Sequence, residues 1–174
     1  SLFIFSILYS QTKAETVYDL LISGEREKGI AILRDLVESE NNKDAMYVLG
    51  LLYNDASSID LCSMEDFCLG QNFSNYKEAK RIFTQLYKDY NDPRAAYSLG
   101  EYYDDHWYFS SNYKKAFNYY LFSAERGVPE AQFNVANMYE HGDGVKKDLT
   151  QSVRWYLQCN NTCLLYTSPS PRDA

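Results

Sequence analysis

Few side chains in this sequence have the type and spacing that metal or acid–base chemistry needs. The 174 residues include only two His and four Cys. His106 follows Asp104 and Asp105, and an imidazole beside two carboxylates could bind a metal ion. Adjacent residues at a helix end point in different directions, so an acidic turn in contact with water is the favoured interpretation. We therefore predict no metal site there.

The second histidine and its neighbouring glycines indicate a loop rather than a catalytic site. His141 precedes Gly142, and the pair Gly142-x-Gly144 has no strand before it, so it is not a dinucleotide-binding motif. No Ser or Cys nucleophile has a supporting base pattern, and no phosphate-binding P-loop occurs. We predict a protein that is not an enzyme and that has no cofactor, no metal and no small-molecule substrate.

Two cysteines, Cys62 and Cys68, stand six residues apart. Without a further Cys or a His nearby, this pair does not have the spacing of a zinc site. In an oxidising compartment the two could form a small disulfide that stabilises the fold by roughly 2 kcal/mol. The alternative, two reduced thiols in a loop, stays open.

Composition excludes two classes of partner. Lys and Arg total 17 against 24 Asp and Glu, which gives a formal charge of −7. An acidic protein is not attracted at long range by nucleic acid or by an anionic membrane surface, so we expect neither as the main partner. No window reaches the roughly 20 apolar residues of a membrane-spanning helix. The hydrophobic fraction of 45% is that of a globular chain, whose elements must bury a core.

One helical pattern occurs three times. In each copy a small residue, an aliphatic residue, a second small residue and a tyrosine stand at positions 1, 5, 6 and 9. Positions 1, 5 and 9 lie on one helical face, and the second small residue lets a neighbouring helix approach closely. We expect these residues to pack the repeats together: Ala45, Leu49, Gly50 and Tyr53, then Ala95, Leu99, Gly100 and Tyr103, then Ala131, Val135, Ala136 and Tyr139.

A second helical pattern follows each copy of the first. It opens with an Asn or Asp suited to cap a helix, at Asn75, Asn112 and Asp148. Its small packing residue comes four positions later, at Ala79, Ala116 and Ser152. The same pattern around Gly29 predicts an earlier second helix, and a helix over residues 16–23 would complete that pair.

The spacing of the copies predicts the fold class. Ala95 and Ala131 are 36 residues apart, as are Ala116 and Ser152, whereas Ala45 and Ala95 are 50 apart. The 14 additional residues indicate an insertion at about 54–74. Helix pairs that repeat at this period are typical of an all-α protein, an α/α solenoid of antiparallel helix pairs in which each pair stacks on the next.

The loop of the third copy carries a family resemblance. Tyr139-Glu-His-Gly-Asp-Gly-Val-Lys-Lys-Asp148, followed by Trp155-Tyr156, resembles the Sel-one-like repeat family, which is related to tetratricopeptide repeats. The resemblance covers roughly residues 29–160, although the first two copies lack the glycine loop. Members of this family are generally scaffolds that bind other proteins. The resemblance therefore implies a non-catalytic protein–protein interaction scaffold.

Within this family the chain is most similar to the branch that serves as the endoplasmic-reticulum adaptor of a membrane ubiquitin ligase in ER-associated degradation. The resemblance implies that the partners are a ligase subunit or recognition factors for misfolded glycoproteins. It also implies a location in the endoplasmic reticulum lumen or the secretory pathway. A generic cytosolic or bacterial-type interaction protein of the same family, located in the cytoplasm, stays open as the alternative.

Two local features agree with a secretory location. Residues 1–14 contain a short apolar run and end in Thr12-Lys13-Ala14, which suits signal peptidase, so we interpret them as the end of a signal peptide. A buried helix of a longer protein is the alternative. Asn72-Phe73-Ser74 is an acceptor sequence for glycosylation within the insertion, which we expect to be a surface loop.

Two further segments lie apart from the repeats. Trp107, Tyr108 and Phe109 are consecutive aromatics that cannot all face one core, so we predict a contact with a partner there, with packing against the insertion as the alternative. Residues 163–174 resemble the in-frame translation of a transposase adapter used in sequencing libraries. We therefore expect the repeat solenoid to occupy residues 15–162 and the tail after it to be non-native.

Overall fold

The structure is a computed structural model that describes residues 16–54, 65–104 and 112–159, with side chains from 76 onward in the second of these ranges. Every regular element in these ranges is a helix, and no strand occurs in them. The chain divides into two compact units, Ser1–Ile82 and Phe83–Ala174. The all-α prediction is confirmed.

The first unit begins with a helix over residues 16–22, as the repeat pattern predicts. It continues with α2 (Arg26–Glu40), α3 (Lys43–Asn54) and the first part of α4 (Glu65–Tyr90). Gly29 lets the first helix lie close to α2, since a Cβ at that position would stand 3.3 Å from Leu21 Cδ2. The core of this unit is mainly aliphatic and includes Val17, Ile30, Leu33, Leu36, Ala45, Met46, Leu49, Ala79 and Ile82.

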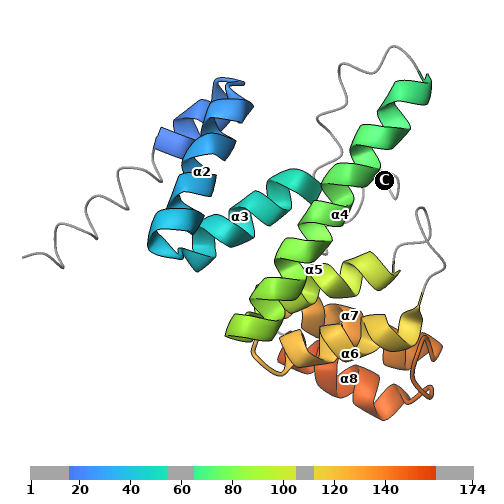
Figure 1. Cartoon of the computed structure of the whole chain (residues 1–174). Helices are drawn as coiled ribbons and strands as arrows, with labels where there is room; N and C mark the ends of the chain where they lie inside the picture. The colour runs from blue at the N-terminus through green and yellow to red at the C-terminus, as the bar shows by residue number, and fades with distance from the viewer. Residues whose placement is uncertain (1–15, 55–64, 105–111, 160–174) are drawn as a thin grey trace, which may run out of the picture. The chain divides into compact units, whose positions relative to one another are not determined.

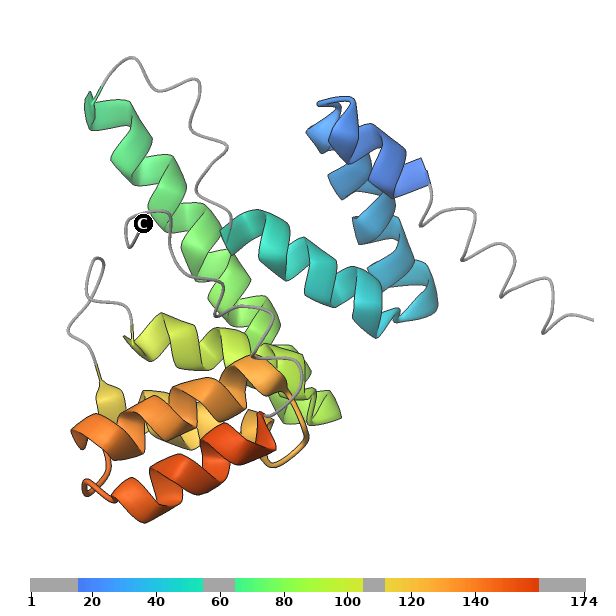
Figure 2. The same cartoon turned by 180° about the vertical axis from the view of Figure 1, so that it is seen from behind.

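The second unit holds the end of α4 and four further helices: α5 (Pro93–Asp104), α6 (Tyr113–Ala124), α7 (Pro129–His141) and α8 (Leu149–Gln158). Consecutive helices among these four pack against each other: α5 against α6, α6 against α7, and α7 against α8 (Figures 1 and 2). One buried cluster joins α6 and α7, with Trp155 of α8 packed against it; it comprises Ala116, Phe117, Tyr120, Ala124, Ala131, Val135 and Met138.

Side-chain caps define where several helices begin. The Asn112 Oδ1 atom accepts a hydrogen bond from the backbone N–H of Lys115 at the start of α6. Asp148 accepts from the backbone N–H groups of Thr150 and Gln151 at the start of α8. Both caps satisfy amide donors that a first helical turn leaves without a partner, as the sequence predicts.

The junctions between successive helix pairs share one backbone geometry. Asn41, Asn91 and Gly127 each have φ near +50° to +90°, the left-handed conformation that ends a helix. After Asn91, the backbone N–H of Asp92 bonds to the Leu86 carbonyl, six residues earlier in the chain. This pairing closes the preceding helix and turns the chain directly into the following one.

The start of α4 corrects one expectation. The sequence predicts that Asn75 caps this helix, with a surface loop before it, but α4 begins at Glu65 and Asn75 lies inside it. No proline occurs between Glu65 and Asp92, and extending an existing helix costs far less than starting one. The backbone of Asn72 and Cys68 is therefore helical.

Several sequence predictions fall outside the described residues. These are the signal segment 1–14, Cys62, the aromatic residues 107–109 and the tail 163–174. The side chains of Cys68 and Asn72 are also outside the description.

Candidate functional site

The small residues of the repeats lie where helices meet. Ala95, Ala116 and Ala131 have no exposed surface, and Ala45, Gly50, Ala79, Ala136 and Ser152 are buried as well. The aliphatic residues of the same pattern, Leu49, Leu99 and Val135, are also buried.

The repeated tyrosines line the ends of these contacts and are half-buried. Tyr139 packs edge-on against Phe117, with ring centroids 5.2 Å apart. Tyr103 stacks on Tyr119 at 5.7 Å, and the Tyr53 hydroxyl accepts a hydrogen bond from Arg34 Nε at 3.1 Å.

Glycines of the loop after α7 allow a close backbone contact. Gly142 ends α7 with φ of +87°, and Gly144 has φ of +68°. A Cβ on Gly144 would stand 2.2 Å from the backbone oxygen of Tyr113, at the start of α6. The loop therefore lies directly on the preceding helix pair, which is the physical reason for glycine at this position.

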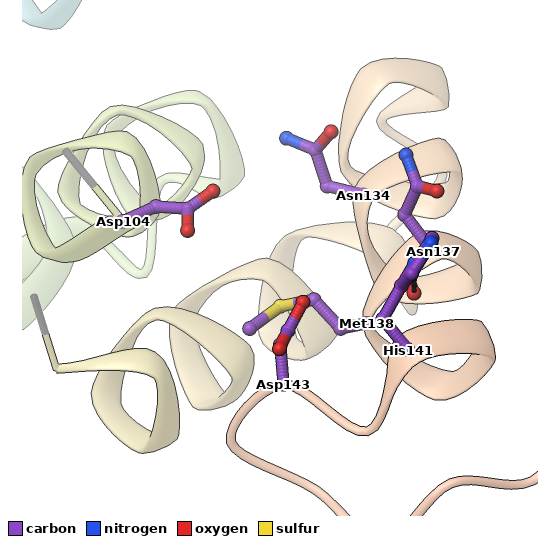
Figure 3. Close-up of a pocket in the computed structure, with 6 residues that line it drawn as sticks. All are labelled: Asp104, Asn134, Asn137, Met138, His141 and Asp143. Carbon is purple, nitrogen blue, oxygen red and sulfur yellow. Dashed lines mark hydrogen bonds between the residues drawn. The ribbon is translucent and has the colours of Figure 1, made fainter. Parts of the chain in front are cut away.

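A pocket of about 320 Å³ lies between the end of α5 and the length of α7. Figure 3 shows Asp104 directed from α5 toward the side chains of α7, with Asp143 from the loop after α7 below them. The other residues that line it come from α7: Asn134, Asn137, Met138 and His141. Five of the six lining side chains are polar, so this pocket is the candidate functional site.

The spacing along α7 explains how one helix supplies most of the site. Glu130, Asn134, Asn137 and His141 follow one another at intervals of four, three and four residues, which places them along one helical face. The buried residues of α7, including Ala131 and Val135, lie on another face. The helix thus buries an apolar side and presents a polar side.

Tyrosines of α6 and α8 lie against two of the site residues. The Tyr120 hydroxyl of α6, on a side chain only 2% exposed, donates to Asp104 Oδ2 at 3.4 Å. The Tyr156 hydroxyl of α8 lies 3.1 Å from Asn137 Oδ1 and 3.0 Å from Glu140 Oε2. Because one hydroxyl proton serves one strong acceptor, donation to the charged Glu140 is favoured. Burial and this carboxylate raise the pKa of Tyr156 to about 12.

The surroundings of the pocket are crowded with acidic groups. Although Glu101 keeps an exposed surface, the protein around it displaces water from its carboxyl and raises its pKa. Asp104 and Glu130 raise this pKa further, while a hydrogen bond with Tyr97 acts in the opposite direction. Negative charge from α5 and α7 therefore converges at this site.

Among the pocket residues, only Asp104 and His141 stand out in the sequence, where both are interpreted as turn or loop residues. No sequence pattern identified the other four, Asn134, Asn137, Met138 and Asp143, as site residues. The signal that could have found the two asparagines is the polar spacing on α7, opposite the Ala and Val positions of the repeat.

The described residues give no sign of metal chemistry or of a membrane span. No group of three His, Cys, Asp or Glu side chains within them is placed to hold a metal ion. No helix in the described ranges is long and apolar enough to cross a membrane. Cys159 is buried and disulfide-bonded, so this cysteine does not offer a free thiol to a metal ion.

Comparison with known families agrees with the helix pairs and the glycine loop. The family model for the Sel1 repeat matches residues 93–128 and again residues 129–158. The two matches together span residues 93–158. Sel1 repeat proteins are generally scaffolds for protein–protein interaction. No curated protein matches the chain significantly.

Solved structures show the same fold over most of the chain. A Sel1 repeat protein from Oxalobacter formigenes has a TM-score of 0.62 and 19% identity over 84% of this chain. The protein c5321, a protective antigen of uropathogenic Escherichia coli with an SLR fold, has a TM-score of 0.59 and 26% identity over 86% of this chain. This chain spans 54% of the first protein and 30% of the second.

Proposed function

We propose that this chain is a non-catalytic scaffold that binds other proteins, with the α5–α7 pocket as a contact site. The observation that supports this is the polar side of α7, whose Asn134 and Asn137 face Asp104 across the pocket within two Sel1 repeats. A helix whose buried side packs the repeat and whose other side carries hydrogen-bonding groups suits recognition of a partner.

Site-specific crosslinking tests this proposal. A photoreactive phenylalanine analogue at position 134 should crosslink to a partner protein in cells that express the full chain. The same analogue at Glu125, an exposed position that does not line the pocket, is the control. Equal crosslinking at both positions, or none at position 134, would overturn the pocket as the contact site.

We also propose a more specific role, a luminal adaptor in a ubiquitin ligase complex of ER-associated degradation. The support is the signal-like segment 1–14, the glycosylation acceptor at Asn72 and the pair Cys62 and Cys68. These features belong together only in the oxidising, glycosylating environment of the secretory pathway. The alternative is a cytoplasmic Sel1 repeat protein in which the three features have no role.

Two measurements on the protein expressed in eukaryotic cells separate these locations. Treatment with a glycosidase should increase the electrophoretic mobility of a luminal protein, and Asn72→Gln should abolish that change. Alkylation without reductant should leave Cys62 and Cys68 unmodified if they form a disulfide. No mobility change, together with alkylation of both thiols, would favour the cytoplasmic protein.

Contact of a partner with Trp107, Tyr108 and Phe109 remains a separate prediction.

A further inference from the structure

We propose that the α5–α7 pocket receives a cationic side chain, an arginine or a lysine, from the partner protein. This inference rests on the proposed scaffold function and names the chemistry of the partner at the same site.

The charge of the lining is the first argument. Asp104 and Asp143 come from different elements, the end of α5 and the loop after α7, and both line one cavity (Figure 3). None of the six lining residues is Lys or Arg. Lys146 and Lys147 follow on the same loop, but their side chains are exposed and do not line the pocket. A guanidinium group can donate to two carboxylates at once, so the pair suits a cation.

The neutral residues that line the pocket also suit a long basic side chain, both its N–H donors and its methylene groups. Asn134 and Asn137 carry carboxamide oxygens that accept hydrogen bonds. Met138 is buried and offers an apolar, polarisable surface to the methylene groups of such a side chain. A cavity of about 320 Å³ has room for one side chain of this kind rather than a folded segment.

Part of the site, the Asp104 carboxylate, is held in place before a partner arrives. The Tyr120 hydroxyl contacts Asp104, and Tyr156 lies within hydrogen-bonding distance of Asn137. Since Tyr120 is almost fully buried, the carboxylate it contacts is anchored to the core of the unit. Groups positioned in advance lose less conformational entropy when a ligand binds.

Repulsion among the acidic groups near the pocket adds to the preference for a cation. Asp104 lies close enough to Glu101 for its charge to disfavour the ionised form of Glu101, and Glu130 acts in the same direction. A bound cation would relieve this repulsion, whereas an acidic side chain would increase it. A partner segment that presents Asp, Glu or phosphate at this position is therefore not expected.

Peptide titration of the full chain tests the inference. The probe is an acetylated and amidated Ala-Arg-Ala peptide, and the matched control is Ala-citrulline-Ala, which keeps the shape but lacks the charge. The side-chain amide signals of Asn134 and Asn137 are followed by NMR. We expect the arginine peptide to bind about fivefold more tightly than the citrulline peptide.

Two isosteric variants locate the effect. Asp143→Asn and Asp104→Asn should each reduce the preference for arginine, while Glu125→Gln, which removes an equal charge elsewhere, should leave it unchanged. Equal binding of the two peptides, tighter binding of an Ala-Glu-Ala peptide, or an effect of Glu125→Gln as large as that of Asp143→Asn would overturn the inference. If one of these results is obtained but position 134 still crosslinks to a partner protein, the cation inference fails and the proposed scaffold function stands.

Discussion

At the scale of single residues, two glycines allow the close contacts on which the second unit depends. Gly100 lies against the ring of Tyr120, and Gly144 lies against the backbone of Tyr113. In both places the missing side chain is a steric requirement, because protein interiors are packed without spare space. The two positions differ in what a new side chain would meet, a ring at one and main chain at the other.

Replacing Gly100 should destabilise the protein through the Tyr120 ring. A Cβ at position 100 would stand 2.4 Å from Tyr120 Cδ1, and the buried ring has no space to retreat. We expect Gly100→Ala to lower the free energy of unfolding by about 1–3 kcal/mol, and Gly100→Leu by more. Urea denaturation measures this loss. In a Tyr120→Leu background the added cost of Gly100→Ala should fall, and an unchanged cost would show that the ring is not the obstacle.

Gly144→Ala should lower the free energy of unfolding more than Gly127→Ala, although both glycines have a positive φ. Gly127 has φ of +87° but no atom within 4 Å of a new Cβ, so Gly127→Ala should cost about 1 kcal/mol from backbone strain alone. Gly144→Ala adds a contact of 2.2 Å with Tyr113 oxygen, and we expect a total loss of roughly 3 kcal/mol. Thermal unfolding of both variants compares them. Equal losses of stability in the two variants would mean that the loop after α7 moves away from Tyr113 at no energetic cost, which would contradict the prediction.

At the scale of elements, the junction from α4 to α5 combines a left-handed turn with a charged cap. Asn91 takes the left-handed conformation, and Asp92 accepts a hydrogen bond from the backbone N–H of Arg94 at 2.9 Å. The Arg94 guanidinium also pairs with Asp92, with 2.7 Å between Nη2 and Oδ2. The helix thus starts at a residue that is both a cap and an ion-pair partner.

This junction predicts a pH dependence of stability. Burial alone would raise the pKa of Asp92, but its hydrogen bonds and ion pair with Arg94 outweigh burial and lower the pKa below its usual value. A lowered pKa in the folded state stabilises the protein above the unfolded pKa, and this contribution disappears as the pH falls through the folded value. Asp92→Asn keeps a capping oxygen but loses the charge.

We therefore expect Asp92→Asn to lower the free energy of unfolding by up to about 1 kcal/mol at pH 7 and to change it very little at about pH 2. Chemical denaturation of both proteins at several pH values measures the difference. Asp89→Asn, an exposed change on the preceding helix, serves as the control. A cost that stays constant over the whole pH range would contradict the role of the Asp92 charge.

At the scale of the whole molecule, α8 presents an apolar face to water. Leu149, Val153 and Leu157 recur every four residues and are 57%, 55% and 62% exposed. Such a stripe along one helix is unusual on a monomer and favours association with another apolar surface. In solenoids the face of one helix pair is normally covered by the next pair.

Concentration-dependent association should result from this stripe. We expect the chain to sediment as a mixture of monomer and larger species at high concentration. Replacing Leu149, Val153 and Leu157 together by Gln should shift it toward monomer without changing its helical content. Thr150→Gln, an exposed change on the same helix, should have no effect. A parent chain that stays monomeric at all concentrations would contradict the prediction.

Local pattern alone was sufficient to predict most of the helices. The small residues at Ala95 and Ala131 and the caps at Asn112 and Asp148 each act within a few residues of their own position, and their recurrence after 36 residues is visible in the sequence. Propensity, capping and helical periodicity are short-range effects, so a sequence displays them directly. The start of α4 escaped prediction because a helix that has already formed extends past a candidate cap such as Asn75 at little cost.

The tertiary structure alone decided where the pocket lies. Asp104 and Asn134 are 30 residues apart in the chain, and nothing in the sequence states that α5 and α7 bring them to one cavity. That placement depends on how tightly α6 packs between its neighbours, and therefore on the fit of Gly100 against Tyr120. The repeat determined which faces of the helices are buried, whereas the packing distances determined which polar groups meet.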